Sequence, residues 1–106
     1  MSFNQHSEVM TLLGESFEQG GLLLKEADLG ENFFDLSTGL AGELLQKFCN
    51  YKQKLALIID DLNKHSEPLQ ELAWEHRKHL NIRFFLNEEQ GRAWLNEKSN
   101  INEDLA

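Results

Sequence analysis

The chain has 106 residues, of which 41% are hydrophobic and 26% are charged, a composition typical of one folded domain with a single core. Its 18 acidic residues outnumber the 10 basic ones and give a net charge of −8. An average surface of this charge repels nucleic-acid backbones and anionic membranes. We therefore expect no nucleic acid and no membrane as a partner, and a basic protein is easier to accommodate.

The single cysteine, Cys49, excludes an internal disulfide and a cluster of thiolates around a metal. We expect its thiol to fill the core, because the sequence places no histidine or lysine beside it to lower its pKa. The first ten residues have neither a basic segment nor a long apolar run, and no stretch of the chain approaches a membrane span. The predicted location is the cytoplasm.

The first half of the chain predicts a helix, a strand and a second helix. Ser7 is the expected N-cap of the first helix, Gly20 and Gly21 end it, and its buried face carries Val9, Leu12, Leu13 and Phe17. The continuous apolar run Leu22–Leu24 predicts a strand covered on both faces. The second helix follows an acidic loop and ends near Asn50, with a buried stripe formed by Leu40, Ala41, Leu44, Leu45, Phe48 and Cys49.

The second half predicts two further strands, 55–59 and 82–86, each followed by a helix. Ser66 and Pro68 open the helix between the strands, whose expected buried face comprises Leu69, Leu72, Ala73, His76 and Leu80. Asn87 and Gln90 form a variant of the capping box for the last helix, which carries Ala93, Trp94 and Leu95. From Asn96 onward we expect a polar, frayed tail.

The resulting order, α-β-α-β-α-β-α, predicts an α/β fold with a small, mostly parallel three-stranded sheet and four helices. Residues 1–106 form one domain, with its core at about 7–95. A sheet of three strands has two open edges, and the first strand carries no proline or inward charge to discourage pairing. We therefore expect a second copy, as a symmetric homodimer, or another protein to cover one edge or face.

A helix start that presents hydroxyl groups is the main candidate site. Asp35, Ser37 and Thr38 can cap the free backbone N–H groups there, and such a helix start also attracts phosphate or carboxylate groups. Capping alone and capping combined with anion binding or phosphorylation are both open. Gly39 and Gly42 lie one turn apart, where we expect close packing by a neighbouring element in preference to ligand contact.

Carboxylates after the first two strands form a possible acidic rim at the carboxyl edge of the sheet, the usual place for ligands in parallel sheets. The rim comprises Glu26, Asp28, Asp60 and Asp61, with Glu31 and Asp35 nearby. Magnesium at this rim, or zinc at His76 and His79 with Glu75, is conceivable, but no spacing matches a known metal motif, and we expect no metal and no cofactor. Trp74 is either an exposed anchor for a protein partner or packed under a loop.

The segments LLLKEADLGENFFDLSTGLAGELLQKF and NYKQKLALIIDD resemble the bacterial family catalogued as domain of unknown function 4180 over residues 7–95. More remotely, the arrangement resembles the STAS fold of sulfate transporters and anti-sigma-factor antagonists. This second resemblance implies that Thr38 stands where antagonists are phosphorylated, although Leu36 replaces the acid two residues earlier. Both families usually begin with a β-hairpin, whereas this chain starts almost at the first helix.

Two functions remain open from the sequence. The favoured one is a noncatalytic protein-interaction or regulatory module, which binds a partner protein through the sheet edge and the helix start. A negative charge on Thr38 or Ser37 could switch this binding. The alternative is a small ligand-binding domain or enzyme, with Asp60 or Asp35 as general base or metal ligand. No nucleophile is paired with a base in the sequence, and we assign no catalytic residue.

Overall fold

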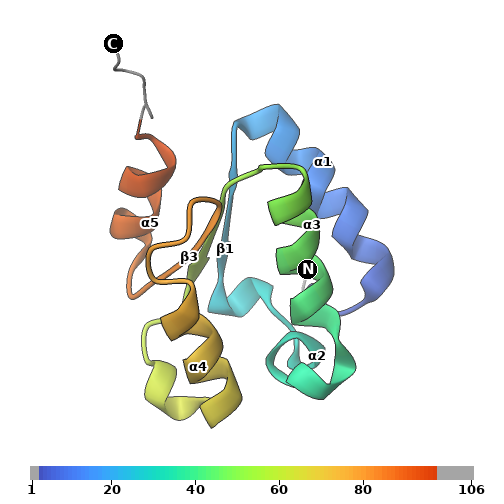
Figure 1. Ribbon diagram of the computed structural model, residues 1–106, viewed down its shortest axis with the longest axis vertical. Helices are drawn as coiled ribbons and strands as arrows, with labels where there is room; N and C mark the ends of the chain where they lie inside the picture. The colour runs from blue at the N-terminus through green and yellow to red at the C-terminus, as the bar shows by residue number, and fades with distance from the viewer. Residues whose placement is uncertain (1–2, 98–106) are drawn as a thin grey trace.

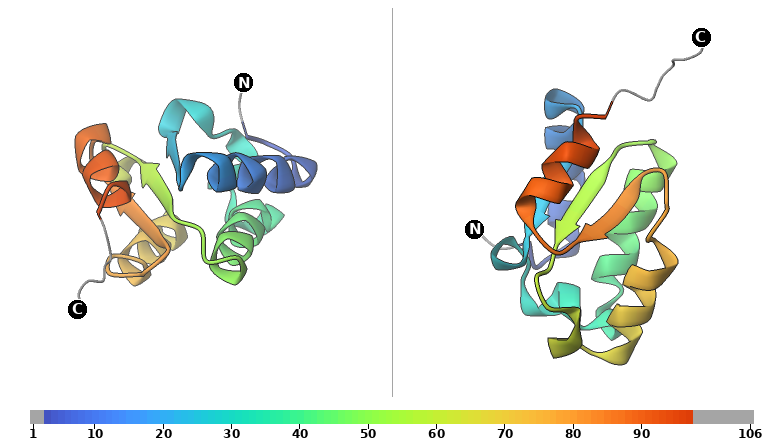
Figure 2. Two further views of the ribbon diagram at one scale, coloured as in Figure 1. Left: turned by 90° about the horizontal axis from the view of Figure 1, so that it is seen from above. Right: turned by 90° about the vertical axis from the view of Figure 1, so that its left-hand side faces the viewer.

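Three parallel strands lie at the centre of the fold, in the order β1-β2-β3. The computed structural model describes residues 3–97. Strand β1 spans Leu22–Lys25, β2 spans Leu55–Ile58 and β3 spans Ile82–Phe85 (Figure 1). Strand β2 lies between the other two (Figure 2, right). The predicted α/β fold with a parallel three-stranded sheet is confirmed.

The helices cover the two faces of the sheet unequally (Figures 1 and 2). Helices α1 (Val9–Gln19), α3 (Leu40–Asn50) and α4 (Glu67–Glu75) lie on one face, and α5 (Glu88–Leu95) lies on the other. Crossovers between consecutive parallel strands share one hand, which places α3 and α4 on the same side. A fifth helix that the sequence did not predict, α2 (Glu31–Phe34), is a single turn in the acidic loop.

The main core lies between the sheet and helices α1, α3 and α4. Its largest fully buried side chains are Phe33, Phe48, Leu13, Leu40, Leu44, Leu55, Leu57, Ile59, Leu69 and Ile82. The predicted stripe of α3 is buried apart from Cys49, which is partly exposed. Removing these apolar side chains from water is the dominant favourable term in folding.

The opposite face is thinner and depends on a close approach of α5. At Gly91 an added Cβ would lie 2.6 Å from Cδ1 of Ile58 and 3.2 Å from Cδ1 of Leu23. Only glycine therefore allows the helix to lie this close to β1 and β2 without displacing side chains. The rings of Trp94 and Phe85 complete this layer, with centroids 5.6 Å apart.

Two of the three predicted N-caps are confirmed. The Ser66 hydroxyl accepts a hydrogen bond from the Leu69 N–H, and the Asn87 side chain accepts one from the Gln90 N–H. Ser7 is not a cap, because a 3-10 turn (His6–Glu8) precedes α1, and the Glu8 carboxylate reaches back to backbone N–H groups. Gly20 adopts the left-handed conformation that ends α1.

Three predictions about burial are wrong. Phe17 is 55% exposed and packs edge-on against Tyr51, while the polar Ser16 is buried in its stead. Leu80 is 79% exposed because α4 ends at Glu75, before the chain turns. Strand β1 is not covered on both faces, since Leu23 is only partly buried and Lys25 is exposed.

Near the chain ends, the structure describes the chain from residue 3 to residue 97. Phe3 forms an isolated parallel bridge with Leu29, and no β-hairpin precedes α1 between residues 3 and 9. Most of the predicted polar tail, 98–106, lies outside the described residues. Within 3–97, no helix combines the length and apolar character needed to cross a lipid bilayer.

Candidate functional site

The turn before α3 is held by the Asp35 carboxylate. It accepts a hydrogen bond from the Ser37 backbone N–H at 3.1 Å and another from the Ser37 hydroxyl at 2.6 Å. Ser37 itself does not cap a helix N–H. Gly39 has φ of +79° and precedes the helix, which explains the glycine there, and an added Cβ at Gly42 would meet nothing within 4 Å. The predicted close packing is therefore wrong at Gly42, whereas an added Cβ at Gly39 would lie 4.0 Å from Cε1 of His6.

The Thr38 hydroxyl joins three parts of this turn. It lies 2.6 Å from the Asn32 carbonyl oxygen and 2.9 Å from that of Asp35, and it accepts a hydrogen bond from the Leu40 N–H at 3.2 Å. Asp35 and Thr38 thus bond to backbone N–H groups as predicted. The Thr38 side chain is exposed to solvent even though its hydroxyl is fully engaged.

A histidine that the sequence reasoning missed completes the turn. One ring nitrogen of His6, Nδ1, contacts the Glu43 carboxylate, and the other, Nε2, lies 3.2 Å from the Thr38 carbonyl oxygen. Both nitrogens face acceptors, and these hydrogen bonds, first that with Glu43, raise the pKa of His6. His6 reaches the carbonyl and not the hydroxyl of Thr38, so this arrangement does not form a nucleophile–base pair.

The acidic rim contains one pair that bridges the ends of two strands. Glu26, directly after β1, accepts a hydrogen bond from Nε2 of His65 at 3.0 Å, and the His65 ring stacks on Phe34 with centroids 4.4 Å apart. The Asp28 carboxylate is turned back to the Lys25 backbone N–H, 2.9 Å away. His65 could have been suspected, because it lies in the polar loop that follows β2.

The other two rim residues do not join this pair. Asp61 accepts a hydrogen bond from the Asn63 N–H and caps a 3-10 turn (Leu62–Lys64), and Asp60 is exposed. No group of three or more His, Cys, Asp or Glu side chains in the described part of the chain is arranged to hold a metal ion. The structure thus brings together Glu26 and His65, while Asp28 and Asp61 serve their own turns.

The outer edge of β1 exposes unpaired backbone groups. Leu22 donates its N–H to the Lys54 carbonyl oxygen at 2.9 Å, so the backbone groups of Leu22 face β2. Because alternate residues of a strand turn these groups to opposite sides, those of Leu23 and Lys25 face outward. The Lys25 N–H is taken by Asp28, which leaves Leu23 with both its N–H and its C=O at the edge.

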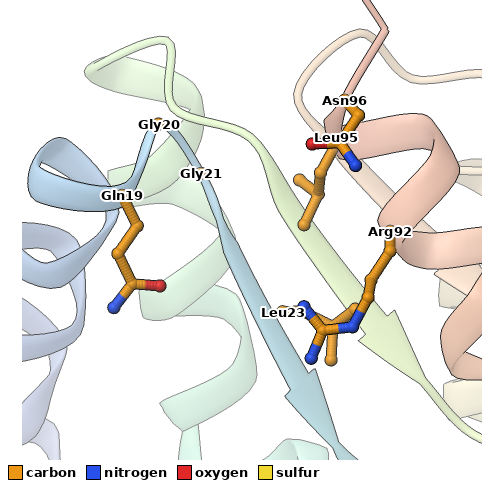
Figure 3. A pocket seen from close by; sticks show the side chains of 7 residues that line it. All are labelled: Gln19, Gly20, Gly21, Leu23, Arg92, Leu95 and Asn96. Atoms are coloured by element: carbon orange, nitrogen blue, oxygen red, sulfur yellow. The ribbon is translucent and has the colours of Figure 1, made fainter.

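A pocket lies on each side of this edge. The α1-side pocket, of about 480 Å³, is bounded by Leu22–Leu24 and lined by Phe3, Glu8, Thr11, Leu12, Glu15, Gln19 and Asp28. The α5-side pocket, of about 210 Å³, is lined by Gln19, Gly20, Gly21, Leu23, Arg92, Leu95 and Asn96 (Figure 3). In Figure 3, Arg92 and Leu95 of α5 approach β1 from one side and Gln19 of α1 from the other.

At the edge of β3, a histidine side chain takes one outward N–H. Nδ1 of His79 accepts hydrogen bonds from the backbone N–H groups of Asn81 and Ile82, at 3.0 and 3.1 Å. The N–H of Ile82 would otherwise face outward, because the Asn81 carbonyl oxygen is bonded to Leu55 of β2. Phe84 faces outward by the same alternation, so one outward N–H is taken at each edge, and β1 is set apart by the pocket on each of its sides.

The model of the family described as "Domain of unknown function (DUF4180)" matches residues 2–95. The chain belongs to this family. No curated protein and no solved structure gave a significant match. The comparisons do not confirm the remoter resemblance to the STAS fold.

In this DUF4180 domain the cysteine has a histidine beside it, contrary to the expectation from the sequence. Nε2 of His79 lies 3.6 Å from Sγ of Cys49. Because Nδ1 of that ring accepts two N–H bonds, Nε2 carries the proton and donates it toward sulfur. Burial raises the pKa of Cys49 and lowers that of His79, whose pKa the charges of His76 and Arg83 lower further. Both groups stay neutral, which disfavours a reactive thiolate.

Trp74 is the most accessible aromatic side chain that the sequence singled out. It is 64% exposed, and the Arg77 guanidinium lies 3.7 Å from its ring centroid. It borders a pocket of about 350 Å³ together with Leu62, Asn63, Gln70, Ala73, Arg77 and Phe84. This geometry fits an exposed anchor for a protein partner better than a side chain packed under a loop.

Proposed function

We propose that the domain is a noncatalytic protein-interaction module that binds a partner chain along the free edge of β1. The observation that carries this function is Leu23, whose N–H and C=O face outward between two pockets. Addition of a strand to such an edge supplies main-chain hydrogen bonds, and pockets on both faces receive alternate side chains. The partner is another protein or a second copy, and the proposed location is the cytoplasm.

A chain of contacts supports regulation of this edge from Thr38. The Thr38 hydroxyl donates to the Asn32 carbonyl oxygen, and Asn32 donates two 3.0 Å hydrogen bonds to Asn4, from its backbone N–H and its side-chain amide. Phe3, the neighbour of Asn4, lines the α1-side pocket. A phosphate on Thr38 would remove the donated hydrogen bond and add negative charge beside Asp35. We propose that this change is transmitted to the pocket through Asn32 and Asn4.

The Glu26–His65 pair favours a second candidate function, a small ligand-binding domain or enzyme at the carboxyl edge of the sheet. His65 is held between a carboxylate and the ring of Phe34, at the place where parallel sheets usually bind ligands. An imidazole paired with a carboxylate is suited to accept or donate a proton. The pair stands alone, however, and Asp60 and Asp35 lie outside it.

Capture experiments with three baits test the proposed function. In Leu23→Pro the outward N–H is lost without removing a bond to β2, whereas Leu23→Val keeps that N–H and loses similar packing. A protein retained from native extract by the unchanged chain and by Leu23→Val, but not by Leu23→Pro, would support binding at β1. Equal retention by all three baits would contradict it.

The regulatory part of the proposal needs a separate comparison. Thr38→Glu places a negative charge at the turn. It should weaken retention of the same protein by more than its loss of stability, measured as a lower melting temperature, can explain. Thr38→Ala loses the same hydrogen bonds without adding charge and serves as its control. Unchanged retention by both variants would remove the idea of a switch.

A further inference from the structure

We infer that the free edge of β1 binds an extended segment of another protein in which basic residues alternate with uncharged ones. The inference rests on the proposed function and specifies the partner. It depends on the different charges of the two faces at this edge and on the side-chain periodicity of an added strand.

The α1-side pocket is acidic above an apolar floor. Glu8, Glu15 and Asp28 line it, and no lysine or arginine is among its lining residues. Its floor includes Leu12, Leu22 and Leu24. A lysine or arginine side chain matches both features, because its aliphatic stem packs on apolar surface while its charged end reaches the carboxylates.

The α5-side pocket disfavours a basic side chain. Arg92 lines it, and Lys25, on the same face of β1, lies 3.5 Å from Glu88, which is also bonded to Arg92. Two cations therefore share one carboxylate at this face. The amide side chains of Gln19 and Asn96 remain to bond a polar group, so an uncharged side chain fits best.

Strand geometry converts these preferences into a sequence pattern. Residues opposite each other in neighbouring strands point to the same face, and successive residues point to opposite faces. The residue that pairs with Leu23 would thus direct its side chain to the α5-side pocket. Its two neighbours in the added segment would direct theirs to the acidic pocket, which gives the pattern basic, uncharged, basic.

A second copy of this chain is a poor occupant of the edge. Antiparallel pairing of two β1 strands about a two-fold axis perpendicular to the sheet would place the two α1 helices on the same face. Glu8, Glu15 and Asp28 of one copy would then face the same three residues of the other. Each chain also carries a net charge of −8, and like charges held together in this way oppose association.

Two peptides of identical composition separate pattern from net charge. The probe KTKTKTKTK alternates lysine and threonine, and KKKKKTTTT has the same charge without the alternation. Titration of each into the full chain, followed by fluorescence anisotropy, should give about tenfold tighter binding for the alternating peptide, because only it places its charges on one face. Equal affinity would overturn the inference and leave the proposed function standing, as would a failure of both peptides to bind.

Matched variants locate the site. Glu15→Gln, inside the acidic pocket, should weaken binding of the alternating peptide about threefold, and Glu18→Gln, on the same helix outside it, should not. Leu23→Pro should abolish binding, with far-UV circular dichroism to verify folding. Binding that survives Leu23→Pro, or that weakens equally in both glutamate variants, would overturn the inference.

Light scattering over a range of concentrations tests the second copy directly. A 12.3 kDa particle at every concentration agrees with an edge reserved for another protein. A particle of twice that mass that Leu23→Pro returns to 12.3 kDa would show that a second copy occupies the edge. That outcome would overturn the basic partner while supporting β1 as the interaction site.

Discussion

Replacing Thr38 by alanine should destabilise the fold by about 1.5 kcal/mol, because the hydroxyl is a structural part of the turn before α3. Its accepted bond from the Leu40 N–H acts as a helix cap, for which the usual cost of removal is about 1 kcal/mol. Its single hydrogen is shared between the carbonyl oxygens of Asn32 and Asp35. Since the side chain is exposed and water can replace this donor, we assign the shared bond about 0.5 kcal/mol.

Urea denaturation followed by circular dichroism measures this change. A loss of about 1.5 kcal/mol should lower the urea midpoint by about 0.5–1.5 M and the melting temperature by about 6–12 °C. Thr38→Ser, which keeps the hydroxyl, should recover most of the loss. Ser37→Ala is the matched control one residue away, and it should cost less than about 0.5 kcal/mol because its hydroxyl bonds only to the exposed Asp35 carboxylate.

Two results would refute this reasoning. If Thr38→Ala were as stable as the unchanged chain, the hydroxyl would be free for another use, and its bonds to the turn would not matter to stability. If Ser37→Ala cost as much as Thr38→Ala, the loss would reflect the turn in general and not the three contacts of Thr38.

Three further predictions concern other parts of the fold. Gly91→Ala should destabilise the chain by about 1 kcal/mol through overpacking, since its Cβ would lie 2.6 Å from a side-chain atom of β2. Gly14→Ala, whose added Cβ would meet nothing within 4 Å, should stabilise the chain by about 0.5–1 kcal/mol. Urea denaturation measures both changes. By NMR titration His6 should show a pKa above 6.5, and Glu43→Gln should lower it. Because the folded state holds that proton more tightly, the His6 contact stabilises below the unfolded pKa, and this stabilisation is lost as pH rises through the folded pKa. Cys49 should react with a thiol reagent at pH 8 at least about tenfold more slowly than in urea, because burial raises its pKa, and equal rates would contradict this account.

The order of elements could be predicted because each change of hydrophobic period in this sequence is marked by a turn or cap. Ser66 and Asn87 cap the helices that were expected to follow them, and the apolar run from Leu55 is a buried central strand. These signals are local, since each depends on residues within one or two turns of each other. The parallel arrangement of the strands then follows from the helices between them.

Contacts between distant segments could not be predicted in the same way. Phe17 has the right spacing for the buried face of α1, but that face is decided by how α1 lies against α3 and β1. The sequence suggested His79 only as a conceivable zinc ligand, whereas it caps the edge of β3 and contacts Cys49, thirty residues away. Such contacts depend on the direction of the chain after Glu75, for which the sequence carries no periodic signal.

In the candidate site, too, contacts between near neighbours could be predicted and contacts between distant residues could not. The bonds of Asp35 and Thr38 within their turn were expected, because capping involves near neighbours. The contacts from His6 and from His65 cross more than thirty residues, and they depend on strand order and register. Two acidic pocket residues, Glu8 in the 3-10 turn before α1 and Glu15 in α1, do not lie in the loops after the strands, so nothing in the sequence groups them with the acidic rim.

The position of α5 has a consequence for biosynthesis. It is the last of the described elements to be made, and among the described helices it is the one that covers its face of the sheet. While the ribosome still holds α5, a nascent chain that has already paired β1, β2 and β3 leaves Ala56 and Ile58 uncovered. The nascent domain therefore exposes an apolar surface through which it can stick to other chains until α5 has left the ribosome and packed on the sheet.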